Sequence, residues 1–254
     1  MPTRPDRFPI LNARPAHDLI NRVTQAQKEL TAIQLTREQK QELDRWVDAG
    51  FACAALGLEG LAVSREEVER GLAESTTANR EDKSGIVSAF DAISALRSLA
   101  SANGLAASLT PTLLIKLNSS AGEAELSHKD ASGTQSPLEA AAATRVAKLG
   151  SACHWFAAES FAELHPAEQS SIVLMRLIEL RPFDEGNTRT ALAASSLFTL
   201  RSALPPIIIK PAMEAAYRAA LNDGMRMNTK PMVDLVTEAL LLTLSEMIER
   251  VRGK

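Results

Sequence analysis

Apolar residues recur at the three-to-four-residue spacing of amphipathic helices along most of this 254-residue chain. The pattern predicts helices over residues 17–34 and 86–103, and a long alanine-rich helix over about 138–163. Two further helices flank residues 182–189 and two more close the chain. Ala and Leu dominate, and aromatic residues make up only 4%. Because sheets favour aromatic and β-branched residues, we expect a mainly α fold.

Local signals mark where several helices begin. The expected starts are Thr36 with Gln39, Ser64 with Glu67, Thr110 with Pro111, and His165 with Pro166. The polar, glycine-bearing stretch 119–137 interrupts the helices and reads as a long loop or a hairpin flap. The chain therefore divides into a flexible arm at 1–16, N-terminal helices at 17–75 and a core at 84–250.

Charge and cysteine content narrow the class of protein. The net charge is −3 with a pI near 5.9, so no basic footprint for nucleic acid is expected. The N-terminus lacks the apolar segment of a signal peptide, and the most apolar late helix contains Asp234, Glu238 and Glu246, unlike a membrane span. Cys53 and Cys153 have no metal-ligand spacing and read as buried free thiols. We expect a cytoplasmic protein.

The stretch "ELRPFDEGNTRTALAAS", residues 179–195, is the most informative part of the chain. Pro182 ends one helix, Gly186 permits a sharp turn, and a new helix starts at about Asn187. The first amides of that helix have no intrahelical partner and suit a phosphate. Arg189 adds a bidentate anion contact, and Glu185 is placed to hold Mg²⁺ bridging phosphate oxygens.

A purely structural interpretation of the same residues is also coherent. Asp184 would cap a helix, and Glu185 would lie there because acids are favoured at helix N-termini. On these residues alone the structural interpretation is the simpler one, because a single Gly-Asn turn is a weak signal.

The stretch "RPFDEGNTRTAL" resembles the signature of the Fic (Fido) family, H-x-F-x-[D/E]-G-N-G-[R/K]-x-x-R. The matching positions are Phe183, Glu185, Gly186, Asn187 and Arg189. The segments that enter and follow the motif are similar to the family's helices, and "ALGLEGLAVSREEV" resembles its N-terminal inhibitory segment, with Glu59 in place. The resemblance implies a Fic-fold helical bundle with a short β-hairpin flap.

Family members typically transfer AMP from ATP to a hydroxyl side chain of a target protein. The resemblance implies that Glu185 holds the metal and that Glu59 is regulatory. It assigns nucleotide binding to Phe183, Gly186, Asn187, Thr188 and Arg189. Mg²⁺ and ATP are the cofactors implied.

Five departures from the family pattern alter this expectation. Arg181 replaces the catalytic histidine, and a guanidinium cannot act as a base at neutral pH. Thr188 replaces a glycine, and Leu192 replaces a second arginine that grips phosphate and pairs with the inhibitory glutamate. Glu59 is left with Arg189 or Arg181 as its partner. Ala55 replaces the inhibitory Ser or Thr, and the flap lacks the family's aromatic residue.

Three hypotheses follow. The first is a degenerate Fic-domain protein that binds nucleotide or phosphate weakly without AMP transfer, because no catalytic residue stands at Arg181. The second is an active adenylyltransferase that uses a non-standard base. The third is a protein-interaction module with a vestigial pocket. The protein partner or target is unknown, a homo-oligomer is left open, and no nucleic acid or membrane partner is expected.

Overall fold

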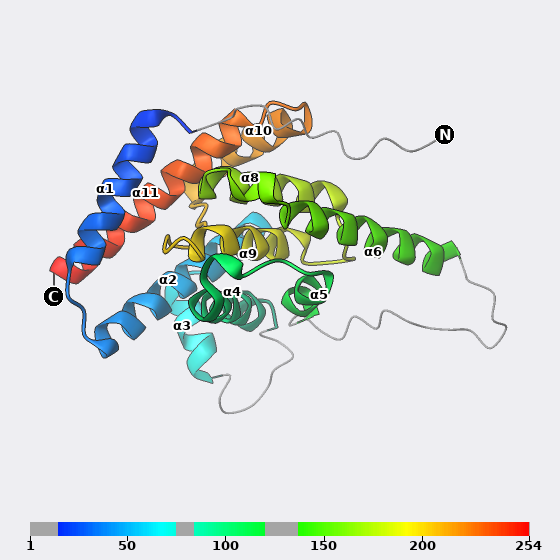
Figure 1. The fold of residues 1–254 in the computed structure, drawn as a ribbon. Helices are drawn as coiled ribbons and strands as arrows, with labels where there is room; N and C mark the ends of the chain where they lie inside the picture. The colour runs from blue at the N-terminus through cyan, green and yellow to red at the C-terminus, as the bar shows by residue number, and fades with distance from the viewer. Residues whose placement is uncertain (1–14, 75–83, 120–136, 254) are drawn as a thin grey trace.

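The computed structural model describes residues 15–74, 84–119 and 137–253, which are helical and contain no strand within these ranges (Figure 1). The α-helices are α1 (His17–Ala32), α2 (Arg37–Leu58), α3 (Arg65–Glu74), α4 (Ser84–Asn103), α5 (Pro111–Ser119), α6 (Pro137–Phe156), α7 (Glu159–Ala162), α8 (Pro166–Leu180), α9 (Asn187–Leu200), α10 (Glu214–Met225) and α11 (Lys230–Arg252). Two short 3₁₀ turns, Gly104–Ala106 and Pro211–Met213, join neighbouring helices. The expected mainly α fold is confirmed; the expected β-hairpin flap falls on residues 120–136, outside the described ranges.

Helix α9 lies in the middle of the bundle and contacts α8, α4, α5 and α2 (Figure 1). All ten residues from Thr190 to Thr199 are buried. The helix is built almost entirely from small and apolar residues, and Arg189 is its only charged residue. Because a buried unpaired charge is costly, Arg189 in the first turn of α9 needs a partner that offsets its charge.

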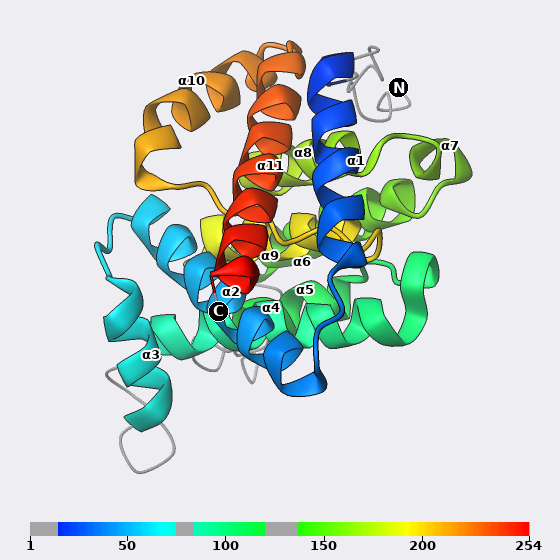
Figure 2. The ribbon, with the colours of Figure 1, turned by 90° about the vertical axis from the view of Figure 1, so that its left-hand side faces the viewer.

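The N-terminal helices share one hydrophobic interior with the rest of the chain. Helix α1 lies along α11 (Figure 2), and α2 packs against both α4 and α9. A single cluster of buried side chains joins Val23 of α1, Val47 of α2 and Leu197 of α9. The segment that carries Glu59 is therefore fixed to the bundle by core packing.

The long helix expected over residues 138–163 is instead two helices, α6 and α7. The chain is extended at Ala158, with φ −67° and ψ 145°, so the helical ladder breaks there. The break lets the buried Phe161 ring pack in a cluster with Trp155, Phe156 and Phe198. The centroids of the rings in contact lie 5.0–6.4 Å apart. Packing of these rings outweighs the helix propensity of the alanines between them.

The expected helix starts are confirmed. Thr36 and Gln39 form a capping box before α2, and Ser64 and Glu67 exchange the same pair of hydrogen bonds before α3. The hydroxyl of Thr110 accepts a hydrogen bond from the Leu113 amide at 3.1 Å. These bonds satisfy first-turn amides that would otherwise lack partners.

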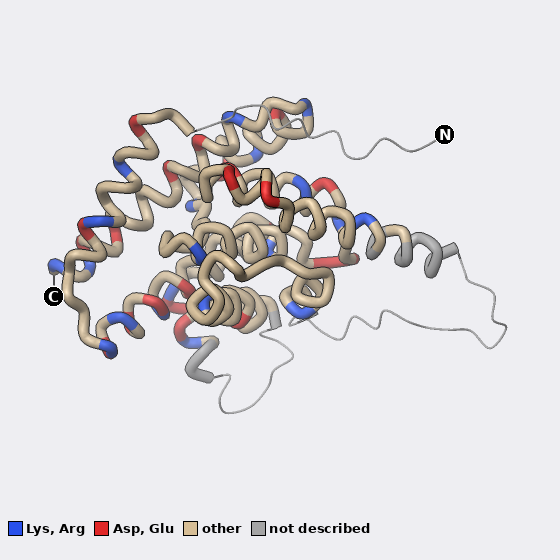
Figure 3. Tube along the Cα trace, in the orientation of Figure 1, with Lys and Arg blue, Asp and Glu red and all other residues tan. Residues whose placement is uncertain are grey.

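Acidic and basic residues are interspersed along the described helices (Figure 3). Within the described residues, no helix combines the length and the apolar composition that crossing a membrane would require.

His165 is the N-cap of α8, a position where Ser, Thr, Asp and Asn are the usual residues. Its Nδ1 atom accepts a hydrogen bond from the Ala167 amide at 3.2 Å, and Glu168 accepts one from the His165 amide at 3.1 Å. Burial lowers the pKa of the His165 imidazole. The neutral ring is the form that can cap the helix, because a protonated Nδ1 has no lone pair to accept with.

We expect His165 to make the protein less stable in mild acid. Because its pKa is lower in the folded state than in the unfolded state, its contribution is complete above the unfolded pKa, about 6.5, and is lost as the pH falls through the folded pKa. The substitution His165→Asn keeps a capping side chain but removes the titration. Urea unfolding of both proteins at about pH 7.5 and about pH 5.5 should show a larger loss in the wild type. An equal loss in both would contradict this role.

Candidate anion-binding site at the start of α9

The turn between α8 and α9 is held by two residues in the left-handed region of the backbone. Arg181 ends α8 with φ 41°, and Gly186 precedes α9 with φ 69°. A Cβ atom on Gly186 would come within 2.7 Å of the Arg189 guanidinium. Gly186 is therefore required both by its backbone conformation and by the close approach of Arg189.

Asn187 braces the turn from inside. Its Oδ1 accepts a hydrogen bond from the Phe183 amide at 3.0 Å, and its Nδ2 donates to the Phe183 carbonyl at 2.7 Å. The half-buried Phe183 ring packs against the core. The amide of Asn187 is thus engaged with the loop backbone, and its role here is to fix the shape of the turn.

Asn118, near the end of α5, fastens the turn from the other side. Its buried Nδ2 donates to the Glu185 carbonyl at 2.9 Å and to the Thr190 hydroxyl at 3.1 Å. One side chain therefore ties α5 to both the turn and the first turn of α9. Sequence analysis missed this residue because nothing in its local pattern distinguishes it from other helical asparagines.

Glu59 is placed by the way in which α2 ends. Gly60 follows it with φ 87°, the Gly60 amide donates to the Gly57 carbonyl, and the Leu61 amide donates to the Leu56 carbonyl, each at 3.0 Å. These are the two hydrogen bonds of a Schellman motif, which ends a helix at a glycine in the left-handed conformation. Glu59 is the last residue before that glycine, so its position is defined by the helix end.

The carboxylate of Glu59 binds the N-terminus of α9. Its Oε1 accepts a hydrogen bond from the Arg189 amide at 3.1 Å, and its Oε2 accepts one from Arg189 Nη1 at 3.0 Å. The two side chains are 15% and 12% exposed, which limits screening by water. The expected proximity of Glu59 to this turn is confirmed, and its partner is Arg189. A carboxylate of the protein thus occupies an amide–guanidinium site that suits an anion.

Arg189 retains an unused donor. Its Nε atom is buried and has no hydrogen-bond partner among the described residues. The guanidinium lies against Gly186, and a Cβ on Gly85 at the start of α4 would come within 3.9 Å of Nη1. Glu59 therefore satisfies only part of the donor set that converges here.

The other residues singled out by sequence lie around this contact with different exposures. Glu185 and Arg181 are exposed, and Thr188 is half-buried in the first turn of α9. Leu192 is 1% exposed and belongs to the hydrophobic core. The position at which the family has its second arginine is therefore filled by core packing in this chain.

The site holds no preformed metal cluster. Groups of three or more His, Cys, Asp or Glu side chains that could hold a metal ion are absent from the described part of the chain. Mg²⁺ is usually bound through one or two carboxylates together with substrate phosphates and water, so an exposed Glu185 fits a metal that arrives with a nucleotide.

Comparisons with known proteins give a family match and a shared fold. Residues 108–199 match the model of the Fic/DOC family. This stretch of the chain is similar to the domain that defines that family. The fold resembles that of Fic-1 from Caenorhabditis elegans, with a TM-score of 0.75 and 20% identity over 91% of this chain and 71% of that one. It also resembles a Fic-domain-containing signaling protein from Bacteroides thetaiotaomicron, with a TM-score of 0.72 and 19% identity over 93% and 98% of the two chains.

Curated relatives are similar to this chain over a shorter stretch. The protein adenylyltransferase fic-1 of Caenorhabditis briggsae is 31% identical over 91 residues, or 36% of this chain and 18% of that protein. The protein adenylyltransferase Fic of Drosophila virilis is 26% identical over 91 residues, or 36% and 19%. The match thus spans less than a fifth of these relatives.

We expect Asn118→Ala to lower the free energy of unfolding by about 1–3 kcal/mol, because it removes the donor to a buried hydroxyl and to the turn. Asn103→Ala is a matched control, since the Asn103 Nδ2 donates only to the exposed Leu99 carbonyl of its own helix. The control should change stability by less than about 0.5 kcal/mol. Equal effects in urea unfolding would show that Asn118 does not hold the turn.

Proposed function

We propose that the Fic domain binds the phosphate groups of a nucleotide weakly at the N-terminus of α9, in competition with Glu59, and does not transfer AMP by the family mechanism. The similar proteins named protein adenylyltransferases support a nucleotide as the ligand. The departures at Arg181 and Leu192 support weak binding without transfer.

The contact between Glu59 and Arg189 carries this proposal. The two oxygens of the Glu59 carboxylate accept from the Arg189 amide and from its guanidinium, as two oxygens of a phosphate would. The unpartnered Nε of Arg189 offers a third donor that Glu59 leaves unused. A phosphate with three acceptor oxygens fits this donor set better than a carboxylate with two.

Loss of the proton acceptor supports the absence of transfer. Arg181 cannot take a proton from an attacking hydroxyl at neutral pH. Among the described residues, His165 caps the opposite end of α8, about 24 Å from Arg181 along the helix. His17 is at the start of α1, and His154 is an exposed residue near the end of α6. None of these three histidines belongs to the turn.

The buried Leu192 supports weak discrimination between nucleotides. It contributes no charge to grip an outer phosphate and is part of the core. Phosphate binding would then depend on Arg189 and the amides of α9, with Glu185 available to a magnesium ion brought by the nucleotide. ATP and ADP should therefore bind with similar affinity.

The substitution Glu59→Ala should strengthen binding of Mg·ATP and Mg·ADP about tenfold or more, because a charge-assisted hydrogen bond contributes roughly 1.5–3 kcal/mol and Glu59 makes two with Arg189. Isothermal titration calorimetry of the wild type and of the variant measures the change. Glu238→Ala is a matched control, since it removes the same charge from an exposed position on α11.

The double substitution Glu59→Ala with Arg189→Ala should abolish the gain. Equal affinities in the wild type, Glu59→Ala and Glu238→Ala would contradict competition by Glu59. A failure of Glu59→Ala to bind either nucleotide would favour the interaction-module hypothesis.

Labelled ATP separates binding from transfer. Neither the wild type nor Glu59→Ala should label itself or proteins in a bacterial lysate. Labelling by Glu59→Ala that disappears when Arg189 is also replaced would instead establish an active adenylyltransferase with a non-standard base.

A further inference from the structure

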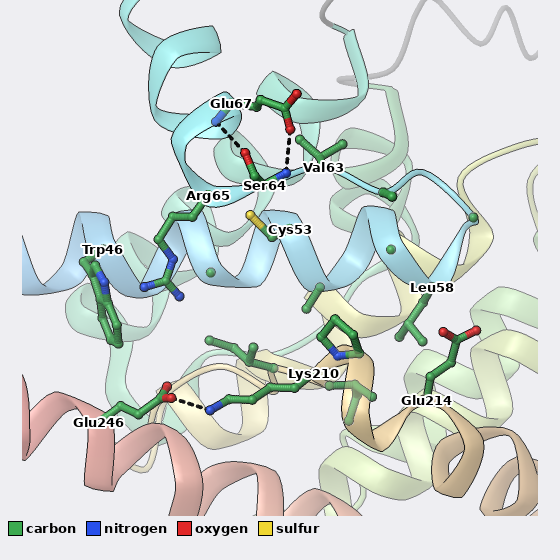
Figure 4. A pocket seen from close by; sticks show the side chains of 18 residues that line it. Trp46, Cys53, Leu58, Val63, Ser64, Arg65, Glu67, Lys210, Glu214 and Glu246 are labelled. Atoms are coloured by element: carbon green, nitrogen blue, oxygen red, sulfur yellow. Dashed lines mark hydrogen bonds and ion pairs between the residues drawn. The ribbon is translucent and has the colours of Figure 1, made fainter.

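A cavity of about 910 Å³ lies beside α2 (Figure 4), and its volume is within the range of small-molecule sites, about 300–1,000 Å³. One wall is the face of α2 that includes Gly50, Cys53 and Gly57. The opposite wall is the segment from Ile208 to Pro211, and residues 62–65 cover the top. We refer to this space as the α2 cavity. Its lining includes Leu58 and Gly60, on either side of Glu59, but neither Glu59 itself nor any residue of the 182–189 turn.

The α2 cavity owes its space to missing side chains on α2. A Cβ atom placed on Gly57 would have no heavy atom within 4 Å. Gly50 lies two turns earlier on the same wall, and a Cβ there would meet Arg65 Nη2 at 2.4 Å. The middle of the cavity is therefore open, and its far end is closed by the Arg65 guanidinium lying on the helix backbone.

The charged groups around the α2 cavity are paired, with one exception. Lys210 pairs with Glu246, as Figure 4 shows, and Glu214 pairs with Arg218. Glu67 is engaged in the capping box with Ser64. Arg65 stacks on the Trp46 ring, with its central carbon 4.1 Å from the ring centroid, but it makes no ion pair with any residue in the described part of the chain.

Stacking on Trp46 uses the face of the Arg65 guanidinium and leaves its N–H groups to bind in the plane. A planar guanidinium presents parallel N–H donors that match the two oxygens of a carboxylate or sulfonate. The walls beside it are formed by Ile208, Ile209, Pro211 and small residues of α2, which suit an apolar body. The α2 cavity thus has a cationic end at Arg65 that suits an anion and an apolar middle that suits a hydrophobic group.

We propose that the α2 cavity binds a small organic monoanion. Its carboxylate or sulfonate group pairs with Arg65, and its flat apolar body lies between α2 and the segment from Ile208 to Pro211. This ligand would bind independently of a nucleotide at α9.

Two fluorescent dyes test the proposal on the full chain. Anilinonaphthalene sulfonate has the required anion and aromatic body, and phenylnaphthylamine has the same rings without the sulfonate. The wild type should bind the sulfonate dye saturably, with one equivalent per chain. Arg65→Gln should weaken binding of the sulfonate dye about tenfold, because it removes a charge-assisted hydrogen bond. The affinity for the neutral dye should stay unchanged.

Filling the cavity provides the second variant. Gly57→Leu should weaken binding of both dyes, because the new side chain enters the open space. The substitution also raises helix propensity, since Gly57 is a helical position. Gly150→Leu on α6 is the matched control, since a Cβ there likewise meets nothing within 4 Å and the residue lies outside the cavity lining. It should leave both affinities unchanged.

Three results would overturn the proposal. The wild type could fail to bind the sulfonate dye saturably, Arg65→Gln could weaken both dyes equally, or Gly57→Leu could act no more strongly than Gly150→Leu. Circular dichroism checks that each variant is folded. If Gly57→Leu is not folded, the affinities of Arg65→Gln for the two dyes still test the proposal.

Discussion

The contact between Glu59 and Arg189 joins the end of α2 to the start of α9, and the arrangement of the candidate site depends on it. Arg189 is the only charge on a helix of otherwise uncharged and mostly buried residues, and its guanidinium is mostly buried. Such a charge requires an anion, because an unpaired ion in a protein interior is strongly destabilising. The Schellman end of α2 supplies one by fixing Glu59 next to the Arg189 amide. The same donors that stabilise Glu59 there are suited to a phosphate, so under the proposed function the Glu59 carboxylate and a phosphate compete for one site.

Much of the fold could be predicted, because helical periodicity and capping residues are local properties of the sequence. Thr36, Ser64 and Thr110 begin helices as expected, since each supplies an acceptor to amides within the next three residues. The break between α6 and α7 could not be predicted. Neither Gly nor Pro marks it, and its cause is the packing of Phe161 against rings from residues 155, 156 and 198, which only the folded chain brings together.

The candidate site was predictable where a motif is contiguous and unpredictable where partners are distant. Gly186 and Arg189 lie where the motif indicates. The choice of Arg189 over Arg181 as the partner of Glu59 depends on how α2 packs across α9, which the sequence does not specify. Asn118 precedes Glu185 by 67 residues, and its contact has no local signal. The burial of Leu192 likewise follows from the packing of α9.

Hydrogen exchange of the Arg189 backbone amide, followed by NMR, tests the central claim most directly. In the wild type this amide is protected by Glu59, whereas the neighbouring Thr190 amide donates to the Gly186 carbonyl within the helix start. In Glu59→Ala, exchange of the Arg189 amide should become about tenfold faster or more, while that of Thr190 stays protected. Unchanged protection of Arg189 would contradict the account, because the α9 N-terminus would then be satisfied without the carboxylate of Glu59.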